Sequence, residues 1–85
     1  MDDLSREVWI QTPDIGDYKE KQKDLFDVIR HYPGKDRIVI FSRKEKAVKR
    51  LPEYQNITGN ENVLKMLINI FGDNNVVTRD AGINW

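Results

Sequence analysis

The chain lacks cysteine, has a single histidine, and contains no apolar run longer than four residues. Without thiols it has no disulfide framework, no Cys nucleophile and no thiolate metal site, and a reducing compartment is expected. The longest apolar run, Ile38 to Phe41, is far below the roughly 20 residues needed to cross a bilayer, and the acidic start Met1 to Arg6 is unlike a basic signal peptide. We therefore expect a cytoplasmic protein that neither spans a membrane nor is secreted by that route.

A charge excess of either sign is also missing, because 14 basic residues balance 14 acidic ones. A domain that binds nucleic acid through its overall field usually has a pI above about 9. Glycine-rich phosphate motifs with G-x-G-x-x-G or Walker spacing are absent as well. Any contact with nucleic acid must therefore be local, and no nucleotide cofactor is expected.

Residues that could carry catalysis are few. Asp2 and Asp3 form the only adjacent acidic pair, and they lie in a terminal segment where solvated charge is the simpler explanation. His31 falls at an expected helix end, where a protonated imidazole would interact favourably with the helix dipole. No nucleophile and base stand together, so we expect no catalytic residue, no metal ligand and no enzymatic activity in this chain itself.

The first half of the chain predicts a strand followed by a helix. Glu7–Thr12 places Val8 and Ile10 on one face and Trp9 on the other, as in a half-buried strand. Asp17 and Glu20 have the spacing of a capping box, which predicts a helix beginning at Asp17. Pro33-Gly34 should end that helix.

The second half predicts a hairpin, a second helix and a last strand. Thr58 and Glu61 again have capping-box spacing, and an apolar stripe follows them until Gly72 ends the helix. The three further strands are expected over Arg37–Arg43, Lys46–Leu51 and Asn75–Arg79.

This order predicts a single small two-layer α/β (α+β) domain with β-α-β-β-α-β topology. Two helices would cover one face of a four-stranded mixed sheet, in either a ferredoxin-like or an incomplete Rossmann-type arrangement. We expect residues 1–6 to be a disordered N-terminal segment, residues 7–79 to be one domain, and residues 80–85 to be a C-terminal tail.

A local concentration of charge lies between residues 43 and 50, where five of eight positions are basic. Such a hairpin could bind phosphates weakly and in a salt-sensitive way, or it could be a solvated hairpin whose lysines protect a sheet edge. We favour the solvated hairpin, and we expect the neighbouring Phe41 to belong to the core rather than to a base-stacking platform. The candidate nucleic-acid contacts are Arg43, Lys44, Lys46, Lys49 and Arg50.

Exposed aromatic residues provide a second kind of candidate. If Val8 and Ile10 face the helices, Trp9 faces away from them, and an indole on the open side of a sheet is a common interface anchor. Ile83 and Trp85 end an apolar tail that could dock onto the domain or onto a partner. We take Trp9, Ile83 and Trp85 as candidate partner-binding residues.

Three stretches together, "EVWIQTPD", "VIRHYPGKDRIVIFSRKEKAVKRLPEYQNIT" and "NVLKMLINIFGDNNVVTR", resemble the extreme C-terminal domain of the bacterial replicative DNA polymerase III alpha subunit of the DnaE type. The resemblance covers about Glu7 to Arg79. The matching residues are His31, Pro33 and Gly34; Ile38 to Phe41; Arg50, Leu51, Pro52, Glu53 and Tyr54; and Gly72, Asn75 and Val76.

The resemblance implies a non-catalytic domain of a DNA-directed DNA polymerase, remote from the catalytic aspartates. It further implies a docking role in DNA replication, with the clamp-loader tau subunit or another replisome protein as the partner. The alternative from the residues themselves is an accessory module that binds single-stranded or primed DNA through the basic hairpin 43–50.

Overall fold

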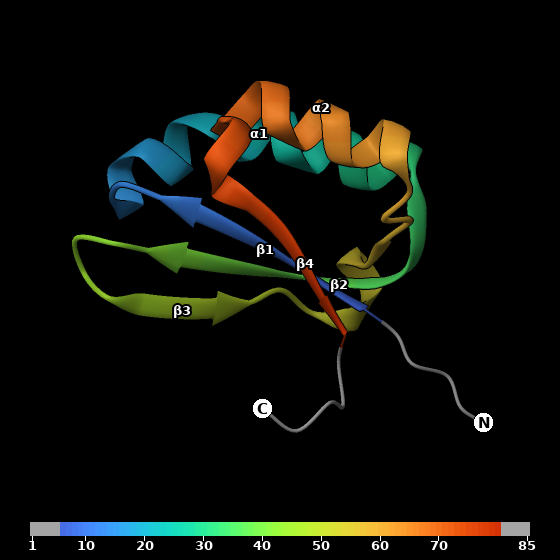
Figure 1. Ribbon diagram of the computed structural model, residues 1–85, viewed down its shortest axis with the longest axis horizontal. Helices are drawn as coiled ribbons and strands as arrows, with labels where there is room; N and C mark the ends of the chain where they lie inside the picture. The colour runs from blue at the N-terminus through green and yellow to red at the C-terminus, as the bar shows by residue number, and fades with distance from the viewer. Residues whose placement is uncertain (1–5, 81–85) are drawn as a thin grey trace.

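The computed structural model describes residues 6–80, which form a four-stranded sheet with both helices packed on one of its faces (Figure 1). The strands are β1 (Arg6–Thr12), β2 (Pro33–Ser42), β3 (Ala47–Arg50) and β4 (Val76–Asp80); the helices are α1 (Ile15–His31) and α2 (Glu61–Phe71), with single 3₁₀ turns η1 (Glu53–Gln55) and η2 (Asp73–Asn75). The predicted fold class and element order are confirmed.

The order of strands across the sheet is β3-β2-β1-β4. β1 and β2 are parallel and directly adjacent, so that Ile10 pairs with Ile40, whereas β3 and β4 run antiparallel to their neighbours. A ferredoxin-like split unit would place another strand between the two parallel strands. In this chain no strand lies between β1 and β2. Of the two arrangements that the sequence allowed, the structure therefore has the incomplete Rossmann-type one and not the ferredoxin-like one.

Both helices begin at residues other than those predicted. The cap of α1 is Asp14, whose Oδ1 accepts a hydrogen bond of 2.7 Å from the backbone N–H of Asp17. The cap of α2 is Asn60, whose Oδ1 accepts from the N–H of Val63 at 2.9 Å. The predicted caps, Asp17 and Thr58, were thus wrong, because another capping residue in each case occupies the position that satisfies the free amides.

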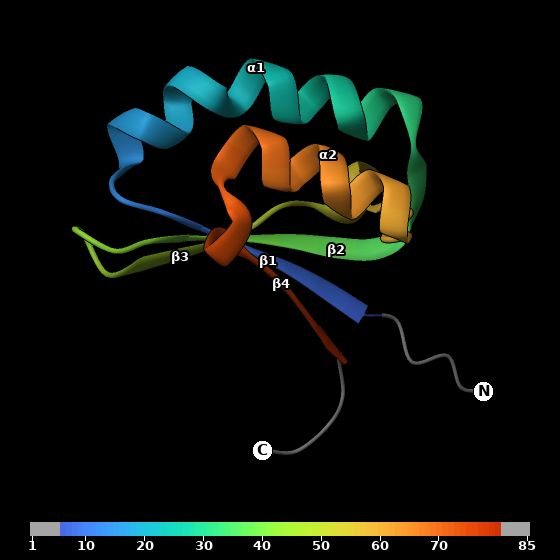
Figure 2. The same cartoon turned by 45° about the horizontal axis from the view of Figure 1, so that its top comes forward.

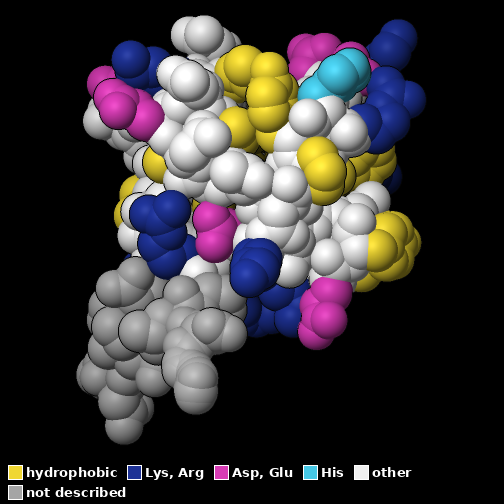
Figure 3. Space-filling view, turned by 90° about the vertical axis from the view of Figure 1, so that its right-hand side faces the viewer, with side chains coloured by type: hydrophobic (Ala, Val, Ile, Leu, Met, Phe, Trp, Pro, Cys, Tyr) yellow, Lys and Arg dark blue, Asp and Glu magenta, His cyan; other side chains and the backbone are white. Residues whose placement is uncertain are grey.

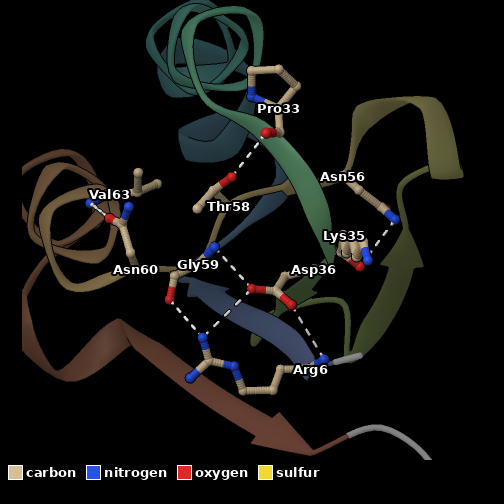
Figure 4. Close-up of polar contacts among 9 residues, drawn as sticks. All are labelled: Arg6, Pro33, Lys35, Asp36, Asn56, Thr58, Gly59, Asn60 and Val63. Carbon is tan, nitrogen blue, oxygen red and sulfur yellow. Dashed lines mark hydrogen bonds and ion pairs between the residues drawn. The ribbon is translucent and has the colours of Figure 1, made fainter. Parts of the chain in front are cut away.

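Thr58 instead helps to hold the loop before α2 against the start of β2 (Figure 4). Its hydroxyl donates to the carbonyl of Pro33 at 2.8 Å, and its N–H donates to the carbonyl of Tyr32 at 2.9 Å. Ile57, fully buried, bridges to Pro33 and Asp36. These contacts extend β2 back to Pro33, whereas the sequence predicted a start at Arg37.

Asp36 is the centre of the same contact region (Figure 4). Its carboxylate accepts from the N–H of Gly59 at 2.8 Å and from the N–H of Arg6 at 3.3 Å, while the Arg6 guanidinium donates to the carbonyl of Gly59 at 3.0 Å. A Cβ on Gly59 would lie 2.5 Å from the Asp36 carboxylate, so a larger residue there would displace that carboxylate from its present contacts. Asp36 thereby joins β1, β2 and the loop before α2.

The remaining strand ends differ from expectation by at most one residue. β1 begins at Arg6 and β4 extends to Asp80, and these two residues pair with each other. β2 ends at Ser42 and β3 covers only Ala47–Arg50, because Lys46 adopts a left-handed conformation with φ 53° that belongs to the turn.

The hydrophobic core lies between the helices and the sheet (Figure 2). β1 and β2 contribute alternating residues and α2 contributes a stripe at helical spacing, so the apolar patterns in the sequence describe the core correctly except at Phe41, which was expected in the core and lies outside it. Its fully buried members include Val8, Ile10, Leu25, Ile38, Ile57, Val63 and Leu67.

Candidate functional site

The face of the sheet turned away from the helices is the most distinctive surface among residues 6–80. No helix or loop of the described chain covers it (Figure 2). Because Val8 and Ile10 point into the core, Trp9 lies on this open face, as the sequence predicted. The strand register aligns one row across all four strands, composed of Arg50, Val39, Trp9 and Val77.

Trp9 is held in place by three charged neighbours. The guanidinium carbon of Arg79 lies 4.8 Å from the centre of the indole, and that of Arg50 lies 5.7 Å from it. The indole Nε1–H donates to Glu7 Oε1 at 3.0 Å, and the other carboxylate oxygen of Glu7 forms an ion pair with Arg50. We call Glu7, Trp9, Arg50 and Arg79 the Trp9 cluster.

The Trp9 cluster covers the sheet beneath it. Val39 is fully buried although it points to the open face, and its register neighbours on the two sides are Trp9 and Arg50. Since no helix packs on this side, these side chains shield Val39 from water. The indole is half-buried as a result and presents only part of its surface.

The neighbours of the Glu7 carboxylate in this cluster favour its ionised form. Partial burial acts to raise its pKa, but hydrogen bonds from Trp9 and Arg50, with the charges of Arg50 and Arg37, outweigh burial and hold the pKa below its ordinary value. Glu7 therefore remains ionised in neutral solution and stabilises the orientation of the indole and one guanidinium.

Apolar side chains extend the open face beyond the cluster. Val48 and Val77 are each 52% exposed, at the two edges of the sheet. Phe41, expected in the core, is partly buried on the open face and lines a hollow of about 320 Å³ with Trp9 and Val77. The open face thus combines an arginine-bounded indole with accessible aliphatic and aromatic surface.

The basic residues of the hairpin are not gathered on one surface. Arg43, Lys44 and Lys46 lie in the turn, and only Lys49 and Arg50 belong to β3. Lys49 pairs with Ile40 and so points to the helix side, whereas Arg50 points to the open face and is engaged by Glu7. The cations are exposed, but their separation offers no continuous track for a phosphate backbone.

The other sequence candidates are placed as follows. His31 lies at the C-terminal end of α1, with Nδ1 2.8 Å from the carbonyl oxygen of Asp27, and is visible at the surface beside charged side chains (Figure 3). Ile83 and Trp85 lie outside the described residues.

Between residues 6 and 80 no three His, Cys, Asp or Glu side chains are grouped so that they could hold a metal ion. No helix in that range is both long and apolar enough to span a membrane.

Arg79 and Glu7 are the members of the Trp9 cluster that sequence reasoning missed. The signal that could have identified them is the strand alternation itself, since Glu7 and Trp9 are two residues apart on one strand and therefore share a face. Arg79 requires knowledge that β4 pairs with β1, which is a long-range feature.

Comparison with known proteins adds no relative: no protein-family model, curated protein or solved structure matches the chain. By its own structure the chain is a small two-layer α/β domain with an open sheet face.

Proposed function

We propose that this chain is a non-catalytic docking domain that binds a protein partner through the open face of its sheet. The observation that carries the proposal is the uncovered row of Arg50, Val39, Trp9 and Val77, with Val48 and Phe41 beside it. Interfaces are enriched in tryptophan and arginine at the positions that contribute most to affinity.

The Trp9 cluster suits this role because its side chains are already ordered. Fixing a flexible arginine on binding costs roughly 0.5–1.5 kcal/mol of side-chain freedom, and here Arg50 is constrained in advance by Glu7 and the indole. A partner that contacts the row meets a rigid centre flanked by accessible aliphatic side chains.

The resemblance to the C-terminal domain of the DNA polymerase III alpha subunit supports a particular partner. On this proposal the parent protein is a cytoplasmic DNA-directed DNA polymerase, and the domain attaches it to the clamp-loader tau subunit, or to another replisome protein, during DNA replication.

The test is an NMR titration of the ¹⁵N-labelled chain with the C-terminal region of tau, at low and at moderate salt. We expect amide shifts concentrated on the open-face residues of β1, β3 and β4, persisting in moderate salt. Val77→Glu and Val48→Glu should each weaken binding at least about 10-fold, which corresponds to about 1.4 kcal/mol.

Tyr54→Ala is the matched control, because Tyr54 is 84% exposed but lies on η1, away from the open face. Loss of binding in Tyr54→Ala equal to that in Val77→Glu would contradict the proposal. A second titration with a short single-stranded oligonucleotide tests the alternative: salt-sensitive shifts confined to residues 43–50, with no response to tau, would replace docking with DNA binding.

A further inference from the structure

A second surface lies on the helix side of the sheet, between the beginning of α1 and the hairpin. α1 packs over β1 and β2, which leaves the helix-facing side of the edge strand β3 uncovered. The resulting groove has a volume of about 230 Å³. Its apolar wall consists of Ile15, Tyr18, Ile40 and Ala47, and Thr12 and Ser42 lie among them.

Tyr18 gives this groove an unsatisfied polar group. The residue is only 5% exposed, and its buried hydroxyl lies near the Gln22 amide without forming a hydrogen bond of good geometry. Burial raises the pKa of Tyr18, and the nearby Gln22 amide only partly opposes that rise. A buried hydroxyl without a partner costs about 1–3 kcal/mol, so a ligand that bonds to it gains affinity.

The edge of β3 supplies backbone groups beside the same groove. The Leu51 N–H donates to the Ile38 carbonyl at 3.0 Å, which makes these two residues a hydrogen-bonded pair of the antiparallel ladder. The alternation of such a ladder then directs the backbone N–H and C=O of Val48 and Arg50 away from β2. An extended segment could pair with these groups as a fifth strand.

The charges around the groove are of one sign. Lys19 and Lys49 line it, and no acidic residue does. Three acidic residues near it along the chain are already engaged: Asp14 accepts from the N–H of Asp17, Asp17 pairs with Lys21 at 3.0 Å, and Glu45 accepts a hydrogen bond from Ser42. Glu20 follows Lys19 in the chain but does not line the groove. The complementary ligand therefore carries carboxylates.

We propose that the groove and the edge of β3 bind an extended acidic and apolar peptide segment of a protein partner. The segment adds to β3 as a fifth strand. On the helix side, an apolar side chain of the segment packs against Ala47 and Ile15, and one of its carboxylates lies between Lys19 and Lys49. A polar group of the segment forms a hydrogen bond with the Tyr18 hydroxyl. This site is separate from the open face and goes beyond the proposed function.

The test starts from selection of displayed random dodecapeptides on the intact chain, followed by NMR titration with the most enriched synthetic peptide. We expect enriched sequences to alternate apolar and acidic residues. The peptide should shift the amides of Ile15, Tyr18 and Ala47–Arg50, and should slow hydrogen exchange at the N–H groups of Val48 and Arg50. Selection that enriches nothing, or a peptide whose shifts map to Trp9, overturns the proposal.

Variants separate the contributions of the hydroxyl and the lysines. Tyr18→Phe should leave the fold intact and weaken the peptide about 3- to 10-fold, whereas Tyr54→Phe, a change at the exposed tyrosine, should leave its affinity unaltered. Lys19→Glu combined with Lys49→Glu should weaken the peptide more than 10-fold, with Lys65→Glu on α2 as the control. Equal affinities in all of these variants contradict the site.

Two other occupants are distinguished in the same experiment. Size-exclusion chromatography that shows a dimer disrupted by Lys49→Glu would identify a second copy of the chain at this edge. A thymidine oligonucleotide that produces the same shifts, with steep loss in salt, would identify a nucleic acid. Either result overturns the peptide proposal. Neither affects the proposed docking at the open face, which the Val77→Glu variant tests separately.

Discussion

Arg79 and Trp9 form a cation–π contact across β4 and β1, with the guanidinium carbon 4.8 Å from the centre of the indole. The register explains why the contact forms. Arg79 pairs with Glu7, two residues before Trp9, so both side chains emerge on the open face and lie diagonally next to each other. The indole thus links the edge strand β4 to the middle of the sheet.

Replacing this indole should reduce stability even though it lies outside the core. Trp9→Ala removes the shield over Val39 and the contacts with both arginines. Because Trp9 is only half-buried, we expect a loss of about 2 kcal/mol, below the ~3–5 kcal/mol found for buried aromatics. Urea denaturation followed by circular dichroism measures it. Val77→Ala, in the same row but 52% exposed, should cost less than about 1 kcal/mol, and an equal cost would contradict the shielding role.

Glu7 should make the folded state sensitive to acid. Its pKa in the folded protein is below the ordinary value of about 4.3, so its contribution is fully present above that value and is lost as the pH falls through the lower, folded pKa. Wild type should therefore exceed Glu7→Gln in stability at pH 7, and the difference should shrink below about pH 4. Urea denaturation from pH 7 to pH 2.5 measures the difference, and a difference that does not vary with pH would exclude this linkage.

The local patterns in the sequence were sufficient for the elements but not for their arrangement. Alternation around Val8 and Ile10 predicts β1 and the side on which Trp9 lies, and the stripe through Val63 and Leu67 predicts α2. Strand order depends instead on pairing between distant segments, which is why two arrangements remained open. The adjacent parallel pairing of β1 with β2 is visible only in the folded chain.

The helix starts and the open face show the same limit. Asp14 and Asp17 are both good caps, as are Thr58 and Asn60. At α2 a tertiary contact decides between the two, since the Thr58 hydroxyl is used by Pro33. The Trp9 cluster likewise needs an arginine from β3 and one from β4, brought together by the sheet order.

Gly34 should tolerate no side chain. A Cβ there would lie 2.4 to 2.6 Å from the Thr58 hydroxyl oxygen and backbone, and the backbone cannot rotate away as a flexible side chain could. We expect Gly34→Ala to destabilise the fold by at least about 2 kcal/mol through overpacking. Gly16→Ala is the control, because its nearest neighbour would lie at 3.3 Å, and its thermal stability should change by less than about 1 kcal/mol. Equal melting temperatures for the two variants would contradict the close approach.

Asn60 should act as the cap of α2. Asn60→Ala removes the acceptor for the Val63 N–H and should cost about 1 kcal/mol, whereas Asn60→Asp, which keeps an acceptor at the helix N-terminus, should restore most of the loss. Chemical denaturation of the three proteins tests this. If Asn60→Asp is as unstable as Asn60→Ala, the side chain stabilises the loop by some other contact.

Tyr18 should limit the stability of the fold in alkaline solution. Burial raises its pKa above the ordinary value of about 10, so the unfolded chain loses the phenolic proton first. The stability that depends on the neutral phenol is therefore fully present below about pH 10 and is lost as the pH rises through the folded pKa. Denaturation from pH 8 to pH 11.5 should show a steeper decline for wild type than for Tyr18→Phe. Tyr54→Phe, a change at a tyrosine that is 84% exposed, should follow the wild-type curve. If stability declined less steeply with pH in Tyr54→Phe than in wild type, Tyr18 would not be the cause of the alkaline transition.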